Sequence, residues 1–194
     1  MSQPPPPAMP SRWEKTGQSL RASCRVFDVL NAGYRHPVRG VEREFVVIDA
    51  PDWVLVIALT PDRRLVLVRQ FRFGADALSL EVPGGVMERG EDPTVAAQRE
   101  LREETGYVGR RARIIGCVLP NPAVQRNTCH FVLVEDAERT AAPAWDPDEE
   151  LEVFTATVEE AFAWAQSGRI THALALNALF LFAPEWERMK AGPV

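Results

Sequence analysis

The sequence predicts a mixed α/β fold built around one main domain. Two continuous apolar runs, at 53–59 and 64–71, are rich in Val, Ile and Leu, as in strands that are buried on both faces. A helix is predicted at 93–105, and two more are predicted near the C-terminus. With 194 residues and 46% hydrophobic residues, the chain can bury a substantial core.

The N-terminal part divides into a tail and a set of strands. Residues 1–19 start with the proline-rich sequence MSQPPPPAMPS, and we expect a mobile extended tail rather than a signal peptide. Strand-like segments near 24–30 and 41–48 assign residues 20–50 to N-terminal strands, followed by the main domain at 51–188.

Within the main domain, the apolar runs at 53–59 and 64–71 are predicted to form a hairpin, because Thr60-Pro61-Asp62 has the composition of a turn. Further strands are expected near 112–119, 128–134 and 151–156. Thr157 and Glu160 then match a capping box, and Gly168 closes that helix. The last helix is expected to start after Thr171 and to end before Pro184. Its apolar surface requires cover from the sheet or from a partner subunit.

Composition narrows the class of partner. A net charge of −5 provides no basic footprint, so nucleic acid is not an expected partner. The longest apolar run, near 173–183, is too short to span a bilayer, so no membrane association is expected. Cys24, Cys117 and Cys129 are an odd number without metal-ligand spacing. Because they lie in strand-like segments, we expect buried reduced thiols in a cytoplasmic protein.

The most informative segment is GVMERGEDPTVAAQRELREETGY, at 85–107. Asp92 as N-cap and Pro93 at the first position predict the start of a helix, and Gly106 predicts its left-handed cap. On that helix Glu100 and Glu104 lie one turn apart, and Glu103 is the i+3 neighbour of Glu100. Three carboxylates therefore share one helix face.

Such a carboxylate cluster repels itself unless a cation intervenes, and hard oxygen ligands suit Mg²⁺ or Mn²⁺. The small residues before the helix allow the backbone to approach the metal, with the carbonyl of Gly84 as a further ligand. Arg99 is expected to be structural and to reach either back to Glu91 or along the helix to Glu103. An isolated acidic run would usually be a solvated helix face, but the upstream loop and the spacing argue against that interpretation.

With Gly85, Glu91, Arg99, Glu103 and Gly106 at these spacings, the segment resembles the Nudix box. That signature belongs to hydrolases that cleave nucleoside diphosphates linked to another group. Only Tyr107 departs from it, since an aliphatic residue is commoner there. The resemblance implies an α/β/α sandwich with a mixed sheet, here preceded by N-terminal antiparallel strands, and catalysis with two or more Mg²⁺ or Mn²⁺ ions.

The runs VLVRQFRFG and LSLEVPGG resemble the ADP-ribose and nucleotide-sugar pyrophosphatase branch, over roughly residues 20–183. The resemblance implies that Arg72 and Arg43 bind the substrate diphosphate and that Glu81 belongs to the substrate site. Either arginine could instead be an ion-pairing surface residue. The branch also implies a homodimer in which the N-terminal strands cross to the neighbouring subunit.

In this branch the general base is often a glutamate on a loop far downstream of the box. The matching stretch here is DPDEELEV, which favours Glu149, with Glu150 next. If that loop is only an exposed acidic segment, Glu103 becomes the better candidate. Attack of an activated water on one phosphorus would release a nucleoside monophosphate and a sugar phosphate.

Selectivity is expected to reside in the loop at 119–131, where Asn121 and Gln125 carry amides able to read a base or a sugar. ADP-ribose and GDP-mannose are about equally compatible with this loop. Two other functions stay open. One is a hydrolase of nucleoside triphosphates or dinucleoside polyphosphates, and the other is a sensor that binds nucleotide sugars without cleaving them.

Overall fold

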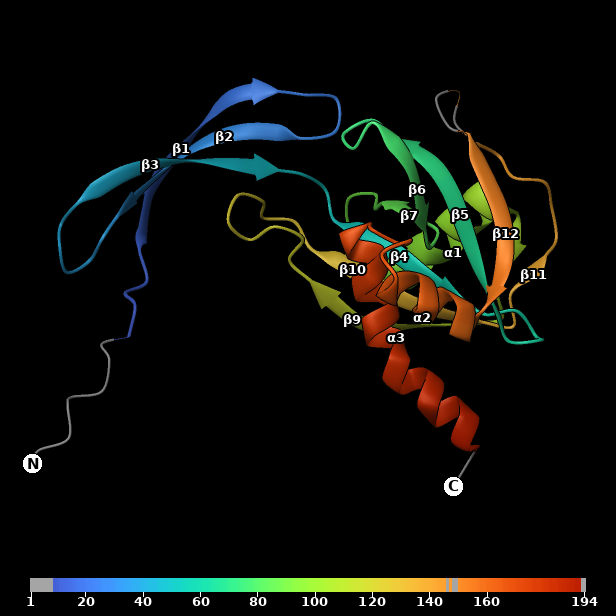
Figure 1. Ribbon diagram of the computed structural model, residues 1–194. Helices are drawn as coiled ribbons and strands as arrows, with labels where there is room; N and C mark the ends of the chain where they lie inside the picture. Colours follow the sequence, from blue (N-terminus) through green and yellow to red (C-terminus); the bar gives the residue numbers. More distant parts are fainter. Residues whose placement is uncertain (1–8, 146, 148–149, 193–194) are drawn as a thin grey trace, which may run out of the picture. The chain divides into compact units, whose positions relative to one another are not determined.

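The computed structural model describes residues 9–145, 147 and 150–192, and its chain forms two compact units (Figure 1). The first unit contains the chain up to Ala50 together with Asn121–Arg126. The second contains Pro51–Pro120 and the chain from Asn127 onward.

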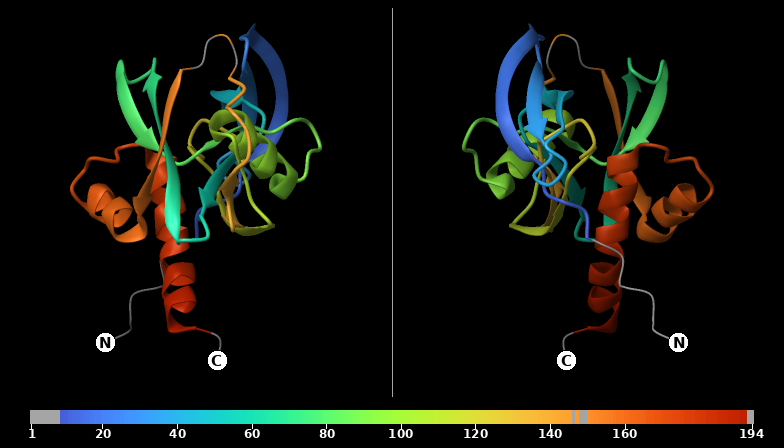
Figure 2. Two further views of the ribbon diagram at one scale, coloured as in Figure 1. Left: turned by 90° about the vertical axis from the view of Figure 1, so that its right-hand side faces the viewer. Right: turned by 90° about the vertical axis from the view of Figure 1, so that its left-hand side faces the viewer.

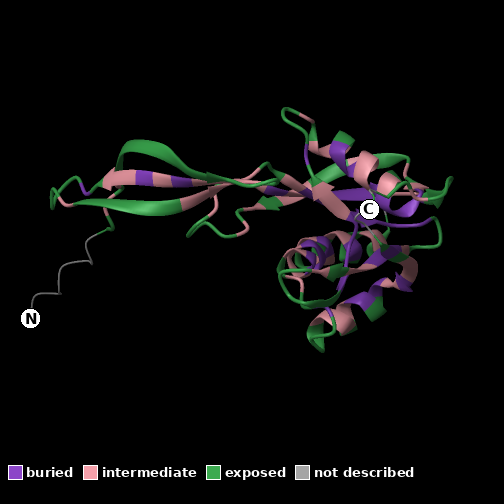
Figure 3. Ribbon diagram, turned by 90° about the horizontal axis from the view of Figure 1, so that it is seen from above, coloured by how far each residue is buried: buried purple, intermediate pink, exposed green. Residues whose placement is uncertain are grey.

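The first unit is an antiparallel sheet of β1 (Glu14–Ser23), β2 (Asp28–Arg35) and β3 (Glu42–Asp49), with β2 in the middle. The middle strand carries the buried residues, whereas β1 is exposed along its length (Figure 3). Strand structure therefore begins inside the range 1–19 that the sequence predicts as a tail. The polar sequence from Glu14 does not by itself predict a strand, but its backbone pairs with β2 and so extends the sheet.

The loop between β9 (Arg111–Val118) and β10 (Cys129–Glu135) contributes to this first unit. The N–H of Ile48 donates to the carbonyl of Val124 at 2.7 Å, and Ile48 forms a parallel bridge with Gln125. Arg126 pairs with Asp49 at the end of β3. The segment expected to set selectivity is thus attached to the edge of the N-terminal sheet.

The second unit contains a mixed four-stranded sheet and a three-stranded antiparallel sheet, with a short pair of strands beside them. The mixed sheet has the order β7-β4-β10-β9, and only its β4–β10 pair is parallel. The other sheet has the order β12-β5-β6. The strands not yet introduced are β4 (Trp53–Ala58), β5 (Arg64–Arg72), β6 (Ala77–Glu81), β7 (Gly84–Val86), β8 (Tyr107–Val108), β11 (Glu138–Arg139) and β12 (Leu151–Thr157).

The predicted hairpin of residues 53–59 and 64–71 is wrong, because β4 and β5 belong to different sheets. Among the described residues, backbone pairing between these two runs is limited to an isolated bridge between Leu59 and Leu65. The turn composition was interpreted correctly, since Thr60 and Arg64 are hydrogen-bonded across the reversal. However, β4 already has β7 and β10 on its two edges and β5 has β6 and β12, so neither needs the other as a partner.

Helices cover the strands from two sides, which confirms the α/β/α sandwich (Figure 2). On one side, Val54 of β4 joins a buried cluster with Leu101 of α1 (Pro93–Thr105). On the other side, the next residue, Leu55, joins a cluster with Phe182 of α3 (Ala173–Ala191), to which α2 (Val158–Gln166) also contributes. Side chains alternate across a strand, so burial on both faces explains the continuous apolar runs.

The last helix does not end before Pro184, as predicted, but continues to Ala191. Proline removes one backbone N–H, which leaves the carbonyl four residues earlier, at Phe180, without its helical partner. Phe180 is 76% exposed, so water can reach that turn. Beyond it, Trp186 packs on Phe182 and donates its indole N–H to Glu159 at 3.1 Å, which favours continuation of the helix.

The cysteines differ from their predicted burial. Cys129 on β10 is buried, and burial raises the pKa of its thiol to about 12. Cys24 and Cys117 are exposed, because Cys24 lies in the turn before β2 and Cys117 lies on the edge strand β9. Among the described residues, no helix combines the length and apolar character needed to cross a membrane.

Candidate active site

The helix α1 has the caps that its sequence predicts. Asp92 accepts a hydrogen bond from the N–H of Thr94 at 2.8 Å, and Pro93 occupies the first position. Gly106 adopts φ 75°, and its N–H donates to the carbonyl of Arg102 at 2.9 Å. A left-handed residue at this position favours glycine.

Two glycines of β7 bring the backbone close to the glutamates of α1. A Cβ on Gly84 would lie 2.2 Å from the carbonyl oxygen of Val54, so strand pairing excludes a larger residue. A Cβ on Gly85 would lie 2.5 Å from Oε2 of Glu100, so the missing side chain makes room for that carboxylate. The N–H of Gly84 donates to Oε2 of Glu104 at 2.9 Å, and Glu104 is buried.

Arg99 makes both of its predicted contacts, one with Glu91 and one with Glu103. Its Nε and Nη2 donate to the two carboxylate oxygens of Glu91 at 3.0 and 2.9 Å. Its Nη1 donates to Glu100 at 2.8 Å and to Glu103 at 3.3 Å. Hydrogen bonds to Glu91, and then to Glu100, raise the pKa of Arg99, and Arg99 in turn lowers the pKa of Glu91. A permanent cation therefore joins the loop before α1 to the carboxylates on the helix.

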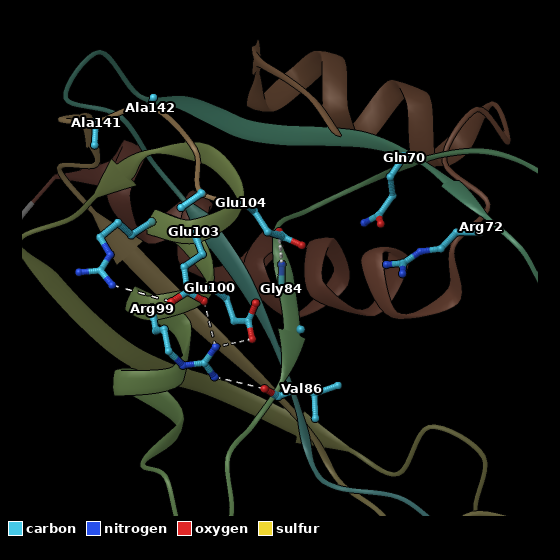
Figure 4. Close-up of a pocket in the computed structure, with 13 residues that line it drawn as sticks. Gln70, Arg72, Gly84, Val86, Arg99, Glu100, Glu103, Glu104, Ala141 and Ala142 are labelled. Carbon is cyan, nitrogen blue, oxygen red and sulfur yellow. Dashed lines mark hydrogen bonds and ion pairs between the residues drawn. The ribbon is translucent and has the colours of Figure 1, made fainter. Parts of the chain in front are cut away.

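These groups line a cavity of about 740 Å³ (Figure 4). Glu100, Glu103 and Glu104 lie on the α1 side, while Gln70 and Arg72 extend toward the cavity from β5. The described residues that line the cavity all come from the second unit: Gln70, Arg72, Gly84, Gly85, Val86, Arg99, Glu100, Arg102, Glu103, Glu104, Ala141, Ala142 and Ala144.

The three glutamates share this cavity but do not converge on one point. In the described part of the chain, no three acidic, histidine or cysteine side chains form a ready-made metal cluster. Arg99 draws Glu100 and Glu103 to one side, and the N–H of Gly84 holds Glu104 on another. The donor set still fits a hard divalent cation, because three carboxylates face one water-accessible space and Gly85 leaves room beside one of them.

On the opposite wall, Arg72 is oriented by Glu81 of the adjacent strand β6. The guanidinium donates to both carboxylate oxygens at 2.8 and 2.6 Å, and Glu81 is 2% exposed. Burial by itself would raise the pKa of Glu81, but the hydrogen bonds and charge of Arg72 outweigh it and lower that pKa. Glu81 therefore lies behind Arg72 as its partner and does not line the cavity itself.

Three predicted substrate-binding residues belong to the first unit. Arg43 lies on β3 and donates to the backbone carbonyl of Glu42 at 2.8 Å. The carbonyl of Asn121 accepts from the N–H of Val124 and of Gln125, which closes a turn, and Gln125 pairs with Ile48. The structure describes their local geometry within that unit, and their roles remain predictions.

The loop that follows β11 closes on the C-terminal end of α1. The N–H of Ala144 donates to the carbonyl of Glu103, and the indole N–H of Trp145 donates to the carbonyl of Glu104, both at 2.8 Å. A Cβ on Gly106 would lie 2.1 Å from the carbonyl oxygen of Ala141, so glycine also permits this close approach. Carbonyls that a helix end leaves without partners are thereby satisfied.

The predicted general bases follow this loop. Glu149 lies outside the described residues, whereas Glu150 is described and exposed. Glu150 directly precedes Leu151, which pairs with Gln70 of the cavity wall. On the two sides of the acidic stretch, Ala144 lines the cavity and Leu151 pairs with Gln70 of the cavity wall.

Several residues at or near the cavity were not identified from the sequence as site residues, among them Gln70, Arg102, Trp145 and His172. Gln70 had a signal, because it stands two positions before Arg72 and so shares its strand face. Arg102 had no separate signal, because it lies on the exposed side of the helix, where an arginine is common. Trp145 and His172 owe their positions to contacts with distant segments, which no local pattern reports.

Comparisons with known proteins agree with this geometry. The sequence model of the NUDIX domain matches residues 50–175. An ADP-ribose pyrophosphatase of Bacillus subtilis (strain 168) is 31% identical over 134 residues, which cover 69% of this chain and 72% of the relative. A GDP-mannose pyrophosphatase of Salmonella arizonae is 32% identical over 116 residues, covering 56% of this chain and 60% of the relative.

A solved structure, described as the crystal structure of an ADP compounds hydrolase, matches with a TM-score of 0.81 and 21% identity. The match covers 96% of this chain and 100% of that one, and it shows the same fold. Together with the box glutamates around one cavity, these findings define a Nudix hydrolase. The chain belongs to the Nudix family.

Proposed function

We propose that this protein hydrolyses the pyrophosphate bond of nucleoside diphosphate sugars of the ADP-ribose or GDP-mannose type. The observation that carries the proposal is the cavity with box carboxylates on one wall and Arg72, fixed by Glu81, on the other. Similarity to an ADP-ribose pyrophosphatase and a GDP-mannose pyrophosphatase supports this substrate class. The products are a nucleoside monophosphate and a sugar phosphate.

Glu100, Glu103 and Glu104 would hold Mg²⁺ or Mn²⁺, with two or more ions per site and Gly84 as a backbone ligand. When bound, such ions lower the pKa of water and neutralise charge on the diphosphate. Arg99 keeps Glu100 and Glu103 near the cavity but also competes for them. Its contact with Glu91 anchors it to the preceding loop, so the carboxylates remain near one another before a cation arrives.

Arg72 binds the substrate diphosphate, because a guanidinium matches phosphate oxygens with two parallel N–H groups. Arg43 is proposed as a second diphosphate ligand, and Asn121 and Gln125 as residues that read the base or the sugar. Glu149 removes the proton from the attacking water, with Glu150 next in order. The pairing of Leu151, which directly follows Glu150, with Gln70 of the cavity wall supports this assignment. Glu103 is the alternative base.

We also propose that the protein is a homodimer formed through its N-terminal strands, and that it functions in the cytoplasm, as the sequence predicts. Support for the dimer comes from the first unit, in which Leu20 of β1 and Phe45 of β3 are exposed apolar residues on one face of the sheet, while Val46 is exposed on the other face.

The proposal is tested by Mg²⁺-dependent release of nucleoside monophosphate from ADP-ribose, GDP-mannose, UDP-glucose, diadenosine polyphosphates and nucleoside triphosphates. Preference for the sugar-linked diphosphates is expected, and EDTA should abolish turnover until Mg²⁺ is restored. Preference for triphosphates or dinucleoside polyphosphates would contradict the substrate class. Binding of nucleotide sugars without turnover would instead indicate a sensor.

Glu104→Gln sharpens this test, because it removes a proposed metal ligand while an amide oxygen can still accept from Gly84. Its turnover should fall by at least ~10²-fold with an unchanged thermal midpoint. The matched control is Glu187→Gln, an exposed position on α3 that pairs with Lys190. That variant should keep the activity of the parent protein.

A further inference from the structure

His172 connects the start of α3 to the Arg72–Glu81 pair. As the N-cap of α3, it accepts the N–H of Ala175 on its Nδ1 at 3.2 Å. Its Nε2 lies 3.8 Å from Oε2 of Glu81. Because Nδ1 is the acceptor, the proton of a neutral imidazole resides on Nε2, so the N–H side of the ring faces the carboxylate.

Glu81 is enclosed by groups from three elements. Arg72 of β5 binds both of its oxygens, Ser79 of β6 hydrogen-bonds to it, and His172 approaches it from α3. A carboxylate that is 2% exposed requires such partners, since burial of an uncompensated charge is costly. A series of polar contacts therefore connects His172, at the start of α3, through Glu81 to the guanidinium of Arg72 on the cavity wall.

Arg72 depends on such support because 42% of its side chain is exposed and the side chain is long. Glu81 holds Nε and Nη2 of Arg72, but the side chain of Glu81 can itself adopt several rotamers. His172 occupies the α3 side of the carboxylate and so limits where Glu81 can turn. Burial lowers the pKa of His172 more than the nearby Glu81 raises it, which keeps the ring in the neutral form that caps the helix.

We propose that His172 is a positioning residue for the substrate diphosphate, which it serves by holding Glu81 and thereby the direction in which Arg72 faces the cavity. This inference rests on the proposed function, in which Arg72 binds the diphosphate. A displaced guanidinium loses its paired N–H contacts with phosphate oxygens, which weakens substrate binding.

Two substitutions separate this role from simple helix capping. His172→Asn keeps a strong N-cap but its side chain is too short to reach Glu81. His172→Gln reaches farther and presents an N–H to the carboxylate, but it is a weaker cap. We expect His172→Asn to raise the KM for the preferred nucleoside diphosphate sugar about fivefold or more, with a smaller change in kcat and a nearly unchanged thermal midpoint.

His172→Gln should show the opposite pattern, with a KM close to that of the parent protein and a thermal midpoint lower by a few degrees. A parent-like KM in His172→Asn would overturn the inference, because capping alone would then explain the residue. Should His172→Asn prove too unstable to assay, the KM of His172→Gln decides: a KM raised about fivefold or more over that of the parent protein would also overturn the inference.

Arg72→Lys distinguishes this inference from the proposed function. It keeps the charge but loses the two-pronged contact, so its KM should rise, and adding His172→Asn should then have little further effect. If Arg72→Lys raises KM and His172→Asn adds its full effect to it, His172 does not act through Arg72 and only the inference fails. If Arg72→Lys leaves KM unchanged, the diphosphate contact of the proposed function fails as well.

Discussion

At Gly85, the space that a side chain would occupy is already filled by the carboxylate of Glu100. The distance from an added Cβ to Oε2 is 2.5 Å, whereas Gly74 has no atom within 4 Å of such a Cβ. A side chain at position 85 would therefore displace the carboxylate of a proposed metal ligand on another element.

Gly85→Ala should displace the Glu100 carboxylate while leaving the backbone in place. We expect a higher Mg²⁺ concentration for half-maximal activity and a kcat/KM reduced about tenfold or more, with little change in thermal midpoint. Mg²⁺ titrations of activity for Gly85→Ala and for the control Gly74→Ala provide the measurement. Identical titration curves for Gly85→Ala and the parent protein would contradict a metal role for Glu100.

At the scale of elements, hydrogen bonds attach the loop from Thr140 to Trp145 to the C-terminal end of α1. Besides Trp145, the N–H groups of Thr140 and Ala144 donate to carbonyls at the end of α1, at 2.9 and 2.8 Å. The acidic stretch that is proposed to contain the general base continues from this anchor. Its starting point is consequently tied to the helix that carries the proposed metal ligands.

Trp145→Phe removes the indole hydrogen bond to the carbonyl of Glu104 and retains an aromatic ring. Loss of about 1 kcal/mol would lower the ratio of attached to detached loop conformations roughly fivefold. We therefore expect kcat to fall by a similar factor. Trp186→Phe is the control, because it also removes an indole hydrogen bond, to Glu159, away from the cavity. Thermal unfolding should show a lower midpoint for the control, whereas steady-state kinetics should show a parent-like kcat. Equal kcat values in both variants and the parent protein would exclude the anchoring role of Trp145.

The elements also show where sequence patterns are informative. The bounds of α1 follow from Asp92, Pro93 and Gly106, which act through neighbours within a turn. The pairing of β4 does not follow from its own residues, because its partners β7 and β10 come from distant parts of the chain. The end of α3 likewise depends on Trp186, whose contacts with Phe182 and Glu159 outweigh the interruption at Pro184.

At the scale of the whole molecule, the proposed homodimer predicts a mass in solution of about twice 21.6 kDa by light scattering. Leu20 on β1 is 60% exposed, and placing a charge there should weaken association through the N-terminal strands. Leu20→Asp is therefore expected to shift the protein toward the monomer. Val38→Asp, at the turn after β2, is the control and should leave the mass unchanged. A monomeric parent protein would refute the dimer and leave the proposed hydrolysis untouched.

The sequence by itself determined the features that depend on interactions between residues close together in the chain. These include the box helix with its caps, the shared face of Glu100, Glu103 and Glu104, and the doubly buried strands, because helix and strand periods place such residues without reference to the rest of the chain. Only the tertiary structure decided which strands pair, that Glu81 supports Arg72, and that Trp145 and His172 reach the site. Those contacts join segments far apart in the chain, and they depend on packing between layers, which no local pattern encodes.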